Sequence, residues 1–318
     1  MTRRTSSDYH MSMKQPHHPP IQPAPATLSK HSLETALELF LQELAARNLS
    51  PNTITAYATD LRQFLTWLQA TDGAITRPDH LSKYEITAYL AYLGGVGLSG
   101  TTRVRKLASL RSFFQCLVKN RLVAVSPAGE VALPKKERKT IVYLRSEEYS
   151  RLLAAAGGNP RDYAILQLFL QTGIRVAELV ALRLADLDLP GRTLHIRGKG
   201  QKERVIDLEK KATLALKSYL AVRSASGDDH LFLNYQGEGI SDRGVKKLVE
   251  KYRKLAGIQK KVSCHSLRHT FVTYKAERGV SAFQLKEWLG HSSLTMPLHY
   301  VHLGRNHLSK KLMEATSL

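Results

Sequence analysis

The chain has 318 residues, of which 43% are hydrophobic, so it is long enough to form two domains that each bury a core. It carries 47 Lys and Arg against 27 Asp and Glu, and the resulting charge of +20 predicts a polyanionic partner, either nucleic acid or an anionic membrane face. Membrane insertion is not expected, because no apolar run is long enough to span a bilayer and the first residues lack the apolar core of a signal peptide. The two cysteines, Cys116 and Cys264, lie far apart in the sequence, which fits a reducing cytoplasm.

Composition and periodicity divide the chain into four parts. Residues 1–29 are rich in Pro, His, Ser and Gln and have almost no periodic apolar pattern, so we expect a disordered tail. Residues 30–122 show apolar residues at helical spacing. Residues 123–140 contain two prolines, a glycine and a basic cluster, which is typical of an extended linker between domains. Residues 141–318 form the second predicted domain.

Four helices are expected in the first domain. Their apolar stripes begin near Leu33, Ser50, Lys83 and Ser99. Ser50 suits an N-cap and Pro51 suits the first helical position of the second helix. The stripes predict a common core, so this part of the chain is interpreted as a small helical bundle.

Polar and basic side chains are concentrated on two of these helices. The second helix carries side chains that can donate hydrogen bonds to phosphates: Asn52, Thr53, Thr55 and Arg62. The fourth helix carries a group of basic residues: Arg103, Arg105, Lys106 and Arg111. A solvated helix face would normally include more acidic residues, so the pattern favours nucleic acid as the partner.

The second domain opens with helical segments and then a hairpin. Gly173 is predicted to turn the chain, and Arg175 to begin a helix that runs through RVAELVALRLADLDL. Residues 193–197 and 203–208 alternate like two strands, which places Lys199 at the tip between them. Further helices are expected over residues 209–224, 242–255 and 265–278, and then from Ser281 to Gly290.

The segment that starts at Cys264 carries most of the candidate chemistry. Read as a helix, it places His265, Arg268 and His269 on one face, because residues three and four apart are neighbours. Two histidines at that spacing would suggest a metal, but Arg268 shares the face and the Glu of a zinc-protease helix is missing. The face suits a phosphate, and Tyr300 would supply an oxygen nucleophile to attack it. The alternative is a surface His-Arg-His face with a buried tyrosine downstream.

Six residues in order carry a resemblance to a known family. They are Arg175, Lys199, His265, Arg268, His291 and Tyr300. In order, local context and spacing this set resembles the tyrosine recombinase (phage integrase) family, most closely its Xer-like members, and the resemblance extends from about Leu33 to the C-terminus. It implies a mainly α fold with a small β-sheet, in which a helical N-terminal core-binding domain precedes a mixed α/β catalytic domain. The MPLHY sequence before Tyr300 departs from the Thr-rich approach usual in the family.

The resemblance also implies a reaction. Tyr300 would attack a DNA phosphodiester and form a 3′-phosphotyrosyl bond, while Arg175 and Arg268, with His265 and His291, stabilise the charge of the transition state. Lys199 is the candidate donor to the leaving 5′ oxygen, and His265 is a plausible base for Tyr300. Glu178, behind Arg175, would orient that guanidinium. Neither a metal nor another cofactor is required.

The partners that the resemblance implies are DNA and further copies of the chain. Contacts to double-stranded DNA carrying a specific recombination site are assigned to two helices of the first domain: Asn52, Thr53, Thr101, Thr102, Arg103 and Lys106. The C-terminal segment has Leu308, Leu312 and Ala315 on one helical stripe, which could pack on its own domain. The resemblance implies instead that it docks on a neighbouring protomer and closes a ring of four on two duplexes. Accessory proteins are further candidate partners. The expected location is the cytoplasm, at the nucleoid.

Two other functions compete with recombination. A type IB topoisomerase-like nicking-closing enzyme would use the same chemistry on a single duplex. A DNA-binding protein with a decayed site would use none of it. The complete set of six residues argues against decay, and a small helical domain ahead of the catalytic one favours a recombinase over a topoisomerase.

Overall fold

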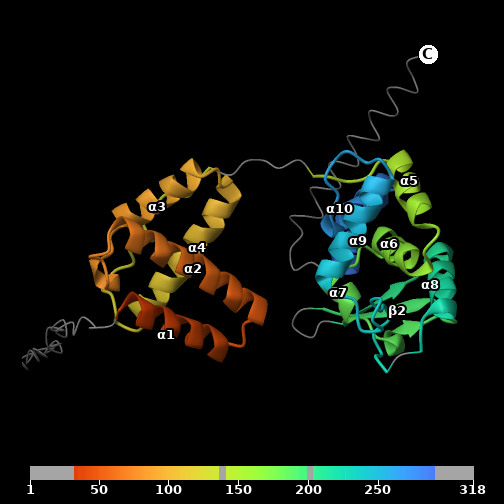
Figure 1. The fold of residues 1–318 in the computed structure, drawn as a ribbon, viewed down its shortest axis with the longest axis horizontal. Coiled ribbons are helices and arrows are strands. Elements are labelled where there is room, and N and C mark those ends of the chain that lie inside the picture. The colour runs from red at the N-terminus through yellow and green to blue at the C-terminus, as the bar shows by residue number, and fades with distance from the viewer. Residues whose placement is uncertain (1–31, 136–140, 199–202, 226, 291–318) are drawn as a thin grey trace, which may run out of the picture. The chain divides into compact units, whose positions relative to one another are not determined.

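The computed structural model describes residues 32–135, 141–198, 203–225 and 227–290. The chain divides into two compact units, residues 1–139 and 140–318, and each is described by itself (Figure 1). Several predicted features lie outside the described residues: the N-terminal tail, Lys199, His291, Tyr300 and the C-terminal helix.

The first unit contains four α-helices among the described residues, as the sequence predicts. They are α1 (Leu33–Ala46), α2 (Pro51–Thr71), α3 (Lys83–Gly95) and α4 (Gly100–Lys119), with the short 3-10 helix η1 (Pro78–His80) before α3. α4 packs against each of the other three α-helices. The largest buried side chains between them are aromatic: Phe40, Phe64, Tyr89, Phe113 and Phe114.

Local sequence signals explain where these helices begin. Ser32, Ser50, Ser82 and Ser99 are the four N-caps, and each side chain accepts a hydrogen bond from a backbone N–H of the first turn. Pro51 stands in the first turn of α2, where its missing N–H costs no helical hydrogen bond. The predicted cap and start of α2 are therefore confirmed.

The packed part of the first unit continues beyond α4 into the segment expected to be linker. Val123, Ala128 and Val131 are buried in the same core as the helices. Arg111 on α4 holds this segment, because its guanidinium donates to the carbonyl oxygens of Ala128 (3.1 Å) and Val131 (2.7 Å). Apolar residues without helical periodicity can still pack when a side chain satisfies the backbone around them.

The second unit is mainly helical with one small sheet, which confirms the expected fold class. Its helices are α5 (Ser146–Ala156), α6 (Pro160–Thr172), α7 (Val176–Ala181), the 3-10 helix η2 (Leu184–Asp186), α8 (Lys210–Val222), α9 (Asp242–Leu255), α10 (Cys264–Glu277) and α11 (Ala282–Leu289). The strands β1 (Leu187–Asp188), β2 (Thr193–Arg197) and β3 (Glu203–Asp207) form an antiparallel sheet in the order β1-β2-β3.

α6 forms the centre of this unit, and Figure 1 shows it among the other helices. Its residues from Ala164 to Leu170 are buried without interruption, and it contacts α5, α8 and α10. A helix that is apolar on all sides requires neighbours on all sides. Asn159 caps its first turn, and Gly173 ends it in the left-handed conformation, which directs the chain into Arg175.

The predicted helix from Arg175 to the end of RVAELVALRLADLDL is wrong in its length. α7 ends at Ala181, and Leu182 is extended. The backbone of the following residues pairs instead with a distant loop: the N–H of Leu231 donates to the carbonyl of Leu182, and the N–H of Leu184 donates to the carbonyl of Asp229, both at 2.8 Å. Tertiary pairing therefore overrides the local helical pattern.

The described residues include no helix that is both long and apolar enough to cross a membrane.

Candidate active site

Three elements of the second unit bring predicted site residues together. Arg175 is the N-cap of α7, Arg268 lies on α10, and α11 ends at Gly290, the residue before His291. Arg268 donates to the carbonyl oxygen of Leu289 at 2.8 Å, and Nη2 of Arg175 lies 3.5 Å from the carbonyl oxygen of Gly290. Both predicted arginines therefore contact the end of α11.

Arg268 is a buried guanidinium, with 6% of its surface exposed. Besides Leu289 it donates to the carbonyl oxygen of Gly173, so it joins the C-terminal ends of α6 and α11. Gly173 has φ +62°, and a Cβ there would lie 2.5 Å from the ring of Phe271. Both the conformation and the close approach require glycine. The turn that presents Gly173 to Arg268 thus depends on that residue.

Glu178 is the centre of the charge arrangement beside Arg175. Its carboxylate accepts hydrogen bonds from the backbone N–H of Arg175 (2.9 Å) and from Nη1 of Arg175 (2.8 Å). It also accepts two from Arg204 on β3, with Nη1 at 3.0 Å and Nη2 at 2.8 Å. Burial alone would raise the pKa of Glu178, but the hydrogen bonds and charge of Arg204, with those of Arg175, outweigh it and lower the pKa. Glu178 is therefore an anion that accepts from both arginines.

Arg204 is the member of this group that the sequence analysis missed. It lies on the same side of β3 as Ile206, and 14% of its side chain is exposed. The available signal was its inward position in the alternating strand, where a charged residue requires a partner. Its partner, Glu178, lies 26 residues earlier in the chain, and no local sequence pattern predicts the pairing.

His265 and His269 lie one turn apart on α10, with ring centroids 6.4 Å apart. Burial and the nearby charges of Arg268, Arg175 and Lys246 lower the pKa of His265, so its imidazole is neutral at neutral pH. A neutral imidazole can accept a proton, which fits the role of base predicted for His265. Burial, then His265 and Arg268, lowers the pKa of His269 to about 4.

Acid pH is expected to destabilise the fold through His269. Its folded pKa of about 4 lies below its ordinary value of 6.5, so between these values the unfolded chain binds more protons. The free energy of unfolding should therefore fall as the pH falls through this window. His269→Gln removes the titrating group, so the free energy of unfolding of this variant should depend less on pH. Urea unfolding of both full-length proteins between about pH 7 and pH 5 measures the effect, and equal pH dependence would contradict it.

The DNA contacts predicted on the first unit differ in their accessibility. Asn52 and Thr101 are exposed, while Thr53, Thr102 and Arg103 are half-buried. A shallow pocket of about 320 Å³ lies between α2 and α4 and includes Asn52, Thr53 and Arg105. These side chains remain candidates for contact with a phosphate backbone.

Lys106 does not fit the DNA contact predicted for it. Only 3% of its surface is exposed, and its ammonium donates to Asp60 at 3.0 Å and to the amide oxygen of Gln63. Asp60 is equally buried and also accepts from Arg105 and from Ser109. Lys106 therefore neutralises a buried carboxylate between α2 and α4, where a phosphate could reach it only by breaking that pair.

Asp60→Ala is expected to destabilise the first unit by about 3–5 kcal/mol, because it leaves the buried Lys106 ammonium without its anion. Urea unfolding of the full-length chain, followed by circular dichroism, measures the loss. Asp72→Ala, at the exposed C-terminal end of α2, is the matched control. If Asp60→Ala lowers the free energy of unfolding no more than Asp72→Ala does, the ion pair of Asp60 and Lys106 does not stabilise the first unit.

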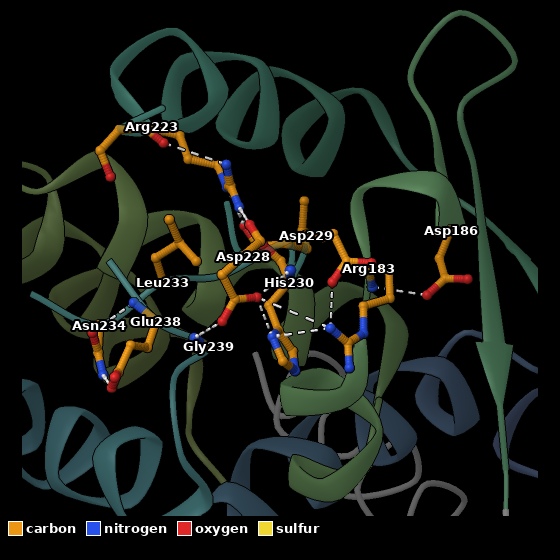
Figure 2. A network of polar contacts seen from close by, with 12 residues as sticks. Arg183, Asp186, Arg223, Asp228, Asp229, His230, Leu233, Asn234, Glu238 and Gly239 are labelled. Atoms are coloured by element: carbon orange, nitrogen blue, oxygen red, sulfur yellow. Dashed lines mark hydrogen bonds and ion pairs between the residues drawn. The ribbon is translucent and has the colours of Figure 1, made fainter. Parts of the chain in front are cut away.

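A second polar network lies around Asp228 and contains none of the predicted catalytic residues (Figure 2). Asp228 accepts from the backbone and ring of His230 and from the N–H of Gly239, and these hydrogen bonds lower its pKa to about 2. Asp228, Asp229 and His230 are close enough to share a metal ion, but Arg183 donates to Asp229 and contacts His230. The Arg183 guanidinium supplies the positive charge that a metal ion would otherwise bring to this cluster. We therefore interpret the network as one that stabilises the loop after α8.

Comparison with known proteins identifies the family. The phage integrase family matches residues 142–307, and the N-terminal SAM-like domain of phage integrases matches residues 37–121. The chain is 36% identical over 271 residues to the tyrosine recombinase XerC of Thermodesulfovibrio yellowstonii, covering 81% of this chain and 88% of the relative. It is 34% identical over 278 residues to the tyrosine recombinase XerD of Listeria monocytogenes, covering 84% and 93%.

Solved structures show the same fold. The XerA recombinase is 27% identical with a TM-score of 0.51, and the match covers 89% of this chain and 99% of that one. A lambda integrase dimer bound to a COC′ core site matches with a TM-score of 0.71 at 19% identity, covering 84% and 97%. Because both family models match and the Xer relatives align over most of its length, the chain belongs to the phage integrase family and is a tyrosine-type site-specific recombinase.

Proposed function

We propose that this recombinase cuts and rejoins DNA strands through a 3′-phosphotyrosyl bond to Tyr300, acting as a tetramer on two duplexes. The observation that carries the proposal is the convergence of Arg175 and Arg268 on the end of α11, immediately before the segment that contains His291 and Tyr300. Two permanently charged guanidiniums at one place suit a phosphodiester whose non-bridging oxygens gain charge in the transition state.

The proposed reaction needs no cofactor, because protein side chains and the DNA supply every proton and every bond that changes. The Tyr300 oxygen loses its proton to a base, for which His265 is the candidate, and attacks the phosphorus. The bond between phosphorus and the 5′ oxygen then breaks, and Lys199 supplies the proton that this oxygen requires. The new phosphotyrosyl ester preserves the energy of the broken bond, so a 5′ hydroxyl from the same or another duplex can reverse the step.

The assembly and the domain roles form part of the same proposal. We assign the helical domain of residues 30–122 to DNA binding and residues 141–318 to catalysis, with the connection between them in residues 123–140. The apolar stripe of Leu308, Leu312 and Ala315 supports docking on a neighbouring protomer, since the short helix that the sequence predicts there is expected to bury its apolar face. With genomic DNA as substrate, the site of action is the cytoplasm, at the nucleoid.

Strand exchange separates recombination from the topoisomerase alternative. DNA fragments that become covalently bound to the protein can be recovered and sequenced to define the site. Two duplexes that carry this site and different labels are then incubated with the full-length protein. We expect products that join strands from both duplexes. Relaxation of supercoiled DNA with no exchange between duplexes would favour a nicking-closing enzyme instead.

A further inference from the structure

The hydrogen bonds of Glu178 are divided between its two arginine partners in an unequal way. Arg204 binds both carboxylate oxygens in an end-on fork, through Nη1 at 3.0 Å and Nη2 at 2.8 Å. The Arg175 side chain binds one of them, through Nη1 at 2.8 Å, and its backbone N–H binds the other. The carboxylate thus accepts four hydrogen bonds, which is about its full capacity.

The position of Arg204 is fixed by this contact. Its Nε is buried and has no hydrogen-bond partner among the described residues, so the fork to Glu178 is the polar contact that holds the guanidinium. Arg204 and Arg175 also lie close to Gly290 at the end of α11, because a Cβ added there would be 3.4 Å from Nη1 of Arg204 and 3.9 Å from Nη1 of Arg175. Arg204 therefore lies where β3, α7 and α11 meet.

Loss of Arg204 would change the partner geometry of Glu178. A buried carboxylate that loses two of four donors is poorly solvated, and a second guanidinium is next to it. Fork-to-fork pairing is the favoured geometry between arginine and a carboxylate. Glu178 would then turn to bind Arg175 through two nitrogens. That pairing would occupy N–H groups of Arg175 that the scissile phosphate needs.

We propose that Arg204 is a positioning residue that occupies Glu178 from the side of β3 and so limits the Arg175 side chain to one contact with that carboxylate. The N–H groups of Arg175 that bind neither Glu178 nor Gly290 are then left for the scissile phosphate. The inference rests on the proposed function, in which Arg175 binds that phosphate. The further step is that Arg204, on β3, sets the orientation of Arg175 through the carboxylate of Glu178. A lysine cannot replace Arg204, because a single ammonium carries the charge but does not form the fork.

The test is single-turnover formation of the covalent complex by full-length protein on a nicked duplex. Arg204→Met is expected to slow it about 100-fold, the cost of a misplaced catalytic group, with half-site affinity within a few-fold of wild type. Arg204→Lys should recover only part of the rate. Arg197→Met is the matched control, because Arg197 lies on the same hairpin but pairs with Asp186 of η2 and with Glu203, and not with Glu178. Its effect should stay within about fivefold.

A second substitution separates positioning from a merely structural role. Adding Glu178→Gln to Arg204→Met should raise the cleavage rate above that of Arg204→Met alone, because a neutral amide does not capture Arg175 as an ion pair. A structural role for Arg204 predicts the opposite, since the double variant would lose more packing and more hydrogen bonds. A wild-type rate for Arg204→Met, or a double variant no faster than the single one, would overturn the inference.

Arg204 lies on the same hairpin as Lys199, so its loss could also slow cleavage by displacing the proposed proton donor. A duplex with a modified leaving group tests this explanation. A duplex with a bridging 5′ sulfur at the scissile position needs no proton donor, because a thiolate leaves more readily than an alkoxide. The defect of Lys199→Ala should shrink on this duplex, and the defect of Arg204→Met should not. If the Arg204→Met defect also disappears, Arg204 acts on proton donation and the inference is wrong. Failure of the wild-type protein to form any covalent complex would instead overturn the proposed function.

Discussion

Tyr300→Phe is expected to abolish the covalent protein–DNA complex and to leave DNA binding almost unchanged. The substitution removes one oxygen, the proposed nucleophile, and retains the aromatic ring. Full-length wild-type and variant proteins are incubated with a nicked duplex that carries the site, and the complex that survives denaturation is measured. Binding to the same half-site is measured by mobility shift in parallel.

The control for this prediction is another tyrosine of the second unit. Tyr235 is exposed on the loop after α8, and its replacement by Phe should leave the covalent complex unchanged. A complex that persists in Tyr300→Phe would show that a different residue attacks the phosphorus.

Arg268→Ala is expected to lower the cleavage rate by about 10²–10³-fold, the effect of removing one donor that stabilises a developing oxyanion. The side chain is buried and donates to the carbonyl oxygens of Gly173 and Leu289, so its loss also leaves two acceptors without a donor. That loss is expected to cost about 1–3 kcal/mol of folding free energy for each carbonyl that water cannot reach. Cleavage is therefore measured at a temperature where urea unfolding shows the variant to be folded.

Arg278→Ala is the matched control, because Arg278 is an exposed arginine at the C-cap of the same helix, α10. It should cleave at about the wild-type rate, since a surface substitution away from the site changes little. Wild-type cleavage by folded Arg268→Ala would remove Arg268 from the charge-stabilising pair. The proposal would then depend on Arg175 alone.

Features of the fold that depend on neighbouring residues could be predicted from the sequence. Ser50 and Pro51 start α2, Gly173 ends α6, and Gly290 ends α11, because caps and left-handed turns are set within one helical turn. The hairpin of β2 and β3 follows from alternation and the glycines between the strands. The resemblance supplied the identity of the site residues and not their geometry.

Features that depend on distant partners could not be predicted. Lys106 looks like a DNA contact until Asp60, 46 residues away, is found beside it. The early end of α7 follows from pairing of Leu182 with Leu231, and no local pattern encodes that pairing. Arg204 is similar, since its importance becomes visible only with the position of Glu178. In each case a buried polar group takes its partner from another element.

The most direct test is peptide mapping of the covalent complex formed by the wild-type protein. The complex is denatured and digested with protease and nuclease, and the peptide that retains nucleotide is sequenced by mass spectrometry. We expect a nucleotide joined through its 3′ phosphate to Tyr300. Nucleotide on any other residue, or a 5′ linkage, would contradict the proposed reaction and the roles assigned to Arg175 and Arg268.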